Sequence, residues 1–242
     1  MEVHHHPHME KKRFKEYFLE FLMIFLAVTM GFFAENIREY FSDNERVTQL
    51  SRELVQDLKK DTATLNENIL QQAQLQKKAD SVFKMLKRPL GTEDIKKIQR
   101  LIAACFESTI FAPSTGAISA IKSQLNLKPF SRSEISKYIT DYESQEIRVS
   151  KIEEIQMEQV RQIVEKFMRD HFNPDNLYAL EIMNSAVDGT LKKTTPEELE
   201  EFRGGIVSIE QFNFILVNVY NTIKNRAVKL MQYARREYNL EE

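Results

Sequence analysis

The chain has 242 residues, of which 42% are hydrophobic and 29% are charged, a balance typical of globular proteins that argues against wholesale disorder. Its 34 basic and 36 acidic residues give a formal net charge of −2, so nothing indicates a nucleic-acid-binding surface, and we expect no nucleic acid partner. Gly and Pro number only 6 each, too few for the closely spaced turns of an all-β fold, so we expect an all-α chain.

Residues 1–16 form a leader that contains four of the five histidines and ends in basic residues. A histidine cluster can bind zinc or nickel, and an expression tag is another source of one. Pro7 interrupts this cluster and no linker follows it, which favours a native leader without a resident metal or other cofactor. The histidines are His4, His5, His6 and His8, and the basic residues are Lys11, Lys12, Arg13 and Lys15.

Residues 17–34 form the apolar run YFLEFLMIFLAVTMGFFA, in which only Glu20 and Thr29 are polar. As a helix this run rises about 27 Å, close to the roughly 30 Å of a bilayer's hydrocarbon core. Each strongly apolar side chain contributes about −0.3 to −0.6 kcal/mol to insertion, whereas a central carboxylate costs about +2.5 to +3.5 kcal/mol. Because Glu20 lies one turn inside the end, the sequence predicts a transmembrane helix with the lipid bilayer as a partner.

A signal peptide or a buried core helix could also contain an apolar run of this length. A cleavable signal peptide needs small residues before its cleavage site, but Phe32 and Phe33 precede the junction after Ala34. A core helix of a soluble protein shows polar positions at helical period, and residues 21–34 show almost none. The transmembrane interpretation is therefore preferred.

The distribution of positive charge predicts the topology of this helix. Four basic residues of the leader precede the span, while only Arg38 and Arg46 lie within a comparable distance after it. The positive-inside rule then places the N-terminus in the cytoplasm and the rest of the chain across the membrane. We expect a single-pass membrane protein; in a Gram-negative bacterium the span would lie in the inner (cytoplasmic) membrane and residues 91–242 in the periplasm.

Glu20 is the most informative residue of the span. Ala27, Gly31 and Ala34 lie seven, eleven and fourteen positions after it, so the carboxyl group shares a helix face with small side chains. Small residues allow a second helix to approach closely, and a carboxylic acid in lipid favours a polar partner. These four residues are the candidate site, a membrane helix-packing face. The alternatives are an ion or proton pathway, and a Glu20 that simply reaches the headgroups.

Residues 35–90 read as an amphipathic helical stalk, continuous with or close to the membrane helix. Apolar residues recur among polar ones at spacings of three, four and seven residues, and the pattern ends near Lys87, before Pro89 and Gly91. The apolar positions are Val47, Leu50, Leu54, Leu58, Leu65 and Ile69.

Residues 91–242 are expected to form a helical bundle domain that packs with the stalk. Long apolar stripes of the kind seen here belong together in an antiparallel bundle. The expected helices are Thr92 to Phe106, Ala117 to Asn126, Ile135 to His171, Leu177 to Val187 and Ile206 to Tyr238. A capping-box spacing at Ser131 and Glu134 precedes the helix that begins at Ile135, and Gly189 closes the helix that begins at Leu177. One more helix is expected before Ile206; it is capped by Thr195, Pro196 and Glu198 and broken at Gly204 and Gly205.

No arrangement of residues in the sequence specifies a reaction. The chain has no phosphate-binding glycine loop, no paired cysteines, no HExxH and no GxSxG, so we expect no enzyme. The lone Cys105 lies in an apolar helical pattern and reads as a small buried hydrophobe. The pairs Glu153 with Glu154 and Tyr138 with Tyr142 are interpreted as solvent-facing or core-edge residues.

The leader and span, KKRFKEYFLEFLMIFLAVTMGFFAENIREYF, resemble the start of a family of uncharacterised bacterial envelope proteins. In that family a basic segment, a hydrophobic helix with an early Glu and a charged stalk precede a domain of unknown function, and Glu20 matches the early Glu. The stretch from Ile121 to Phe130 is similar to a second pattern of that family, a Leu-Lys-Ser turn followed by an Asn-Leu pair and a helix that ends in tyrosine. The residues that match it are Lys122, Ser123, Asn126 and Leu127. It departs from that pattern at Leu125 and Pro129, and no tryptophan follows the span. The resemblance implies a single-pass envelope protein and no activity.

These features favour a membrane-anchored structural or interaction protein, which forms a homo-oligomer or binds another membrane protein. The alternative is a sensory element that relays a signal through the stalk to a partner's membrane helices, because a leader of about sixteen residues holds no output domain. A periplasmic hydrolase is third. A pocket of buried polar groups inside the bundle would favour sensing, and a solid core with an apolar outer patch would favour docking.

Overall fold

The computed structural model describes residues 14–103, 109–181 and 187–240. Within these ranges every regular element is a helix, apart from one isolated bridge between Phe172 and Leu191, so the all-α fold class is confirmed. The elements are α1 (Phe14–Met85), α2 (Thr92–Ala103), α3 (Gly116–Ser123), α4 (Lys128–Ser131), α5 (Ile135–Val160), the π-helix η2 (Arg161–Glu165), α6 (Lys166–His171), α7 (Pro174–Glu181) and α8 (Pro196–Glu237). The leader residues 1–13, with their histidines, and Cys105 lie outside the described residues.

Helix α1 is one uninterrupted helix of 72 residues, so the predicted membrane segment and the predicted stalk are continuous. At about 1.5 Å per residue it is about 108 Å long. It ends at Met85, two residues before the predicted end. Its buried residues recur with the spacing of a coiled-coil seam, at Val47, Leu54, Asp61, Asn68, Leu75 and Val82 and at Leu58, Leu65, Gln72 and Ala79.

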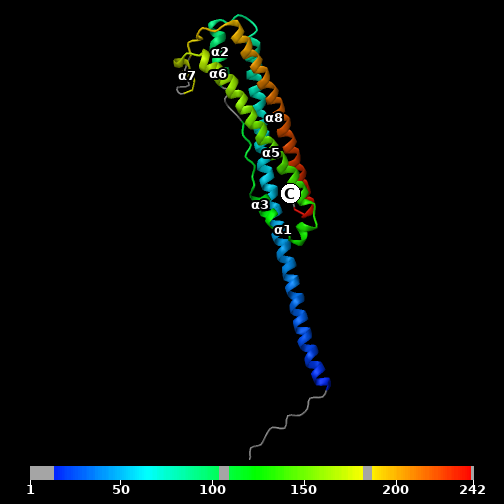
Figure 1. The fold of residues 1–242 in the computed structure, drawn as a ribbon. Coiled ribbons are helices and arrows are strands. Elements are labelled where there is room, and N and C mark those ends of the chain that lie inside the picture. The colour runs from blue at the N-terminus through cyan, green and yellow to red at the C-terminus, as the bar shows by residue number, and fades with distance from the viewer. Residues whose placement is uncertain (1–13, 104–108, 182–186, 241–242) are drawn as a thin grey trace, which may run out of the picture.

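The part of α1 that precedes Val47 projects from the rest of the molecule (Figure 1). From Val47 onward α1 packs against α8, and α8 also packs against α5. Helices α1 and α5 run in the same direction and α8 runs in the opposite one (Figure 1). Because α1 and α5 run the same way, the chain must return along the bundle between them, and residues 109–115 and α3 make that return.

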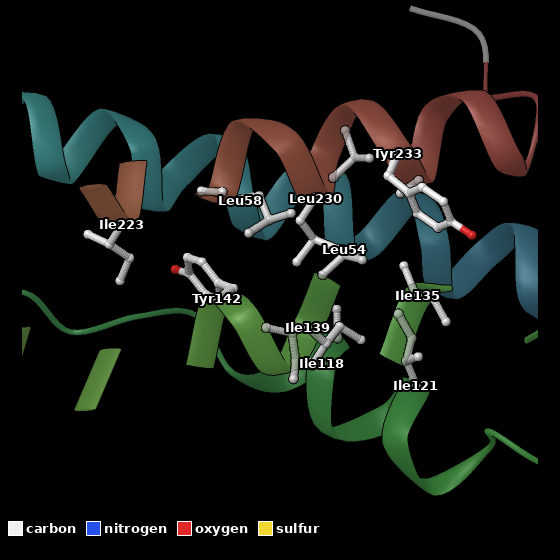
Figure 2. Packing of buried hydrophobic residues seen from close by; sticks show 14 of the residues in the cluster. Leu54, Leu58, Ile118, Ile121, Ile135, Ile139, Tyr142, Ile223, Leu230 and Tyr233 are labelled. Atoms are coloured by element: carbon white, nitrogen blue, oxygen red, sulfur yellow. The ribbon is translucent and has the colours of Figure 1, made fainter. Parts of the chain in front are cut away.

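Two apolar clusters hold the long helices together. The first lies nearer the projecting part of α1, where Leu54, Tyr142 and Leu230 come from three different helices and point into a common core (Figure 2). The second lies at the far end, where the rings of Phe167 and Phe202 stack with centroids 3.8 Å apart. Each of the three long helices contributes buried residues to the first cluster, so packing against the others stabilises each of them.

The predicted helix break at Gly204 and Gly205 is wrong. Helix α8 runs without interruption from Pro196 to Glu237, and its capping box at Thr195 is present as predicted. A Cβ on Gly205 would lie only 2.4 Å from Cγ2 of Ile163, whereas one on Gly204 would meet nothing within 4 Å. Gly205 therefore permits close approach of α8 to η2, and packing of the α8 face outweighs the low helix propensity of the two glycines.

The capping box predicted at Ser131 and Glu134 is also wrong. Ser131 belongs to the short helix α4, which was not predicted, and α5 begins at Ile135 without a side-chain cap. The Glu134 N–H instead donates to the hydroxyl of Tyr233, at 2.7 Å, so a residue of α8 satisfies it. The Ile135 to His171 segment is helical throughout, as α5, η2 and α6.

Candidate functional site

The apolar segment of α1 is the first candidate site, because nothing in the described chain covers it. Its most apolar window of 18 residues has a mean hydropathy of 2.0 and none of it is buried, so α1 contains a candidate membrane span. Phe21, Ile24 and Phe33 are 63%, 66% and 64% exposed. A core helix of a soluble protein would be mostly buried, so this finding counts against that alternative.

The predicted packing face lies on this segment. Ala27, Gly31 and Ala34 are exposed and Glu20 is half-buried. A Cβ built on Gly31 would meet no heavy atom of the described chain within 4 Å apart from its chain neighbours and the backbone of its own helix. Because α1 is helical across all four positions, the spacing that groups them on one face is preserved. What the face packs against stays a prediction.

A second candidate is a cluster around Asp61, which sequence reasoning missed. Asp61 is buried on α1, and the Tyr142 hydroxyl of α5 donates to its Oδ2 at 2.7 Å. The backbone N–H of Ser114 donates to its Oδ1 at 2.9 Å. One turn earlier, Asp57 accepts from the N–H of Ala117 at 3.3 Å. Two carboxylates of α1 thus bind the backbone that leads into α3.

A second polar network, centred on Glu153, lies further along the bundle. Oε1 of Glu153 accepts from the N–H of Phe111 at 2.9 Å and from the hydroxyl of Tyr220 at 2.6 Å. The Tyr220 hydroxyl also lies 2.9 Å from Oγ1 of Thr109, which accepts from Nε2 of Gln72 at 2.6 Å. Gln156 continues the network by donating to Gln72 and to Asn213.

The cluster around Asp61 and the network centred on Glu153 have the same structural role. Residues 109–115 form no helix or strand, so their backbone N–H groups need other partners where they are buried. Glu153 and Asp61 supply acceptors for Phe111 and Ser114. The polar interior therefore fixes the return segment between α2 and α3 against the long helices.

The interpretation of Glu153 and Tyr142 as solvent-facing or core-edge residues is wrong. Glu153 is 5% exposed and Tyr142 is fully buried, whereas Glu154 is exposed as expected. One signal was present in the sequence, because Asp61 and Asn68 occupy positions on the seven-residue stripe of α1 where apolar residues are the norm. The partners of these residues lie far away in the chain, and no local pattern reveals them.

Burial raises the pKa of Glu153, against the lowering effect of the hydrogen bonds from Tyr220 and Phe111. Burial, followed by the charges of Glu143 and Asp61, raises the pKa of Glu146 to about 7. Burial also raises the pKa values of Tyr142 and Tyr220, so both remain protonated donors. In the described residues no group of three or more His, Cys, Asp or Glu side chains has the arrangement of a metal site.

The surface carries hollows away from this interior. A groove of about 500 Å³ at the far end is lined by residues of η2, α6 and α8 and by Lys193; Lys166, Phe167 and Phe202 are among them. His171 also lines it, and its Nδ1 lies 3.1 Å from Oγ1 of Thr194. Another hollow lies over the exposed apolar residues Val207, Phe214 and Ile215 of α8.

Comparison with known proteins gives no family assignment. No family model, no curated protein and no solved structure matches the chain. The resemblance to uncharacterised envelope proteins thus rests on the matching residues of the leader, the span and the stretch from Ile121 to Phe130.

Proposed function

We propose that the chain is a membrane-anchored structural or interaction protein of the bacterial cell envelope. Residues 17–34 cross the inner membrane, the N-terminus is cytoplasmic, and an antiparallel helical bundle docks a partner or builds an oligomer on the periplasmic side. The proposal assigns the chain no catalytic step. The exposed apolar segment of α1 supports it most, because such a surface needs a bilayer or a partner to cover it.

Two further observations support docking over sensing. Asp61 and Glu153 each accept hydrogen bonds from a tyrosine hydroxyl and from a backbone N–H of the return segment, so both carboxyl groups are already bonded within the fold. On the outer face of α8, Val207, Phe214 and Ile215 are 37%, 62% and 39% exposed, which forms an apolar patch of the kind that partners bind.

The sensory alternative is favoured by one observation, the raised pKa of Glu153, whose Oε1 accepts from the N–H of Phe111 in the return segment. A change in its protonation would alter this contact, and the same segment is bonded through Ser114 to Asp61 of α1, which leads without a break into the candidate span.

Crosslinking in native membranes tests the packing face. Single cysteines replace Ala27 or Gly31 in a chain that carries Cys105→Ser. We expect disulfide crosslinks to a second copy or to another membrane protein at one of these positions, and we expect Gly31→Leu to abolish them while the chain stays in the membrane. A control cysteine at the exposed Arg52 of α1 tests whether the reagent reaches the protein.

If that control crosslinks and neither membrane position does, the packing face does not exist and Glu20 reaches the headgroups. Topology is measured separately with a reporter fused after Glu242, which we expect to be active only in the periplasm. A reporter active only in the cytoplasm of intact cells would reverse the orientation.

A further inference from the structure

The exposed apolar surface of α1 continues beyond residue 34. Ile37, Tyr40 and Phe41 are 56%, 61% and 67% exposed, and the described chain buries no residue of α1 before Val47. At the start of this stretch Glu35 and Arg38 form an ion pair in which Nε of Arg38 donates to Oε2 of Glu35 at 3.0 Å. This pair offsets two charges, and Glu39 is a further charged residue of the stretch.

The aromatic residues of this stretch match the dimensions of a bilayer. Tyrosine is enriched at both membrane interfaces, and Tyr17 and Tyr40 are both exposed at opposite ends of the apolar surface. They are 23 residues apart, which is about 35 Å along a helix. That length lies between the roughly 30 Å of the hydrocarbon core and the roughly 40–45 Å that includes the headgroups. Each tyrosine can therefore lie in an interfacial layer.

The unbroken helix then fixes the height of the bundle above the membrane. From Tyr40 to Arg46 the helix rises only about 9 Å. At Arg46 the bundle begins, because its Nε donates to Oε1 of Gln124 at 3.2 Å. Helix α4 also packs against α1, and the turn between α3 and α5 lies at the end of the bundle nearest the projecting helix (Figure 1). We call residues 124–132 the base of the bundle.

The base carries side chains suited to a lipid surface. Asn126, Lys128 and Arg132 are exposed, and the base contains no acidic residue. Lysine and arginine side chains reach about 6 Å beyond the backbone and bind headgroup phosphates. The acidic residues nearby are Glu39, Asp43 and Glu45 of α1 and Glu134 at the start of α5.

We propose that the base of the bundle rests on the outer headgroup layer and binds anionic lipid through Lys128 and Arg132. This inference rests on the proposed membrane anchor and extends it: the bundle is held upright at the bilayer surface instead of on a free stalk. The far end, with its groove, then stands roughly 60 Å above the membrane, since residues 47–85 of α1 rise by that distance.

Depth-dependent fluorescence quenching tests the proposal on the full chain. The chain, with Cys105→Ser, is reconstituted into vesicles of phosphatidylcholine and phosphatidylglycerol and labelled at a single cysteine replacing Val28, Asn126 or Asp175. A nitroxide is placed on the lipid headgroup or in the acyl chain. We expect headgroup nitroxide to quench the label at 126, acyl-chain nitroxide to quench the label at 28, and neither to quench the label at 175.

The outcomes separate the two proposals. If the label at 28 is quenched by acyl-chain nitroxide and the label at 126 is not quenched, the anchor stands and the base does not touch the membrane. If the label at 28 is not quenched, the anchor and the contact are both wrong.

A pair of double variants tests the lipid charge. We expect Lys128→Gln with Arg132→Gln to lose the additional quenching at 126 that phosphatidylglycerol gives over phosphatidylcholine alone. The control, Arg169→Gln with Lys193→Gln, removes two exposed charges at the far end and should leave this difference unchanged. If the increase in quenching caused by phosphatidylglycerol is the same in both double variants, recognition of anionic headgroups is refuted.

Discussion

Replacing Glu146 with glutamine should stabilise the protein at neutral and alkaline pH. Burial of this carboxyl, followed by the charges of Glu143 and Asp61, raises its pKa from the ordinary 4.5 to about 7. The difference between these pKa values corresponds to about 3 kcal/mol of unfolding free energy. Glu146 is only half-buried, so solvent screening reduces this, and we expect about 1–2 kcal/mol.

The direction follows from proton binding. The folded chain holds this proton more tightly than the unfolded chain, so the free energy of unfolding falls as the pH rises from 4.5 to about 7. Below that window both states are protonated at Glu146 and the penalty is absent. Glu146→Gln keeps the size of the side chain and removes the charge. The variant should therefore gain stability over the native chain at about pH 8 and gain nothing at about pH 4.5.

Urea unfolding of the detergent-solubilised chain, followed by far-ultraviolet circular dichroism at several pH values, measures this gain. Glu154→Gln is the matched control, because Glu154 is exposed on the same helix and its loss should leave the stability unchanged. The reasoning is refuted if the gain from Glu146→Gln is the same at both ends of the pH range, or if Glu154→Gln reproduces it.

Three further changes have expected outcomes in the same unfolding assay. Gly205→Ala should cost about 1–3 kcal/mol, because its Cβ would lie 2.4 Å from Cγ2 of the β-branched Ile163. The control Gly204→Ala enters open space and should instead stabilise α8 by about 0.5–1 kcal/mol; equal effects would contradict the close approach of α8 to η2. Glu153→Ala should cost about 2 kcal/mol or more, since two buried donors lose their acceptor, and a neutral result would show that the return segment does not depend on it. Deleting residues 1–40 should leave a soluble, cooperatively unfolding helical domain, because no residue of α1 before Val47 is buried; aggregation of the fragment would move the domain boundary.

Local patterns in the sequence determined most of the helices. The apolar run over residues 17–34 and the stripe from Val47 onward predicted the course of α1 to within two residues, because helix period and apolar length act over neighbouring positions. The capping box at Thr195 was equally readable, since its two hydrogen bonds join residues only three apart. The topology and the Glu20 face were also inferred from the sequence alone and await their experiments.

Tertiary structure decided the features that depend on residues far apart in the chain. Gly204 and Gly205 read as a helix break by propensity, yet contact of Gly205 with Ile163 makes the glycine a requirement of packing. Glu153 and Tyr142 read as ordinary solvent-facing or core-edge residues until Phe111 and Asp61 supplied partners.

The physical reason is the same in each case. A buried polar group is stable only when a hydrogen-bonding partner is brought to it, and that partner comes from another helix or from the return segment. The sequence by itself therefore determined where helices form and which segment is apolar enough for a membrane. Only the fold decided which acids lie inside the bundle, because residues 109–115 run back along it and their buried N–H groups need acceptors there.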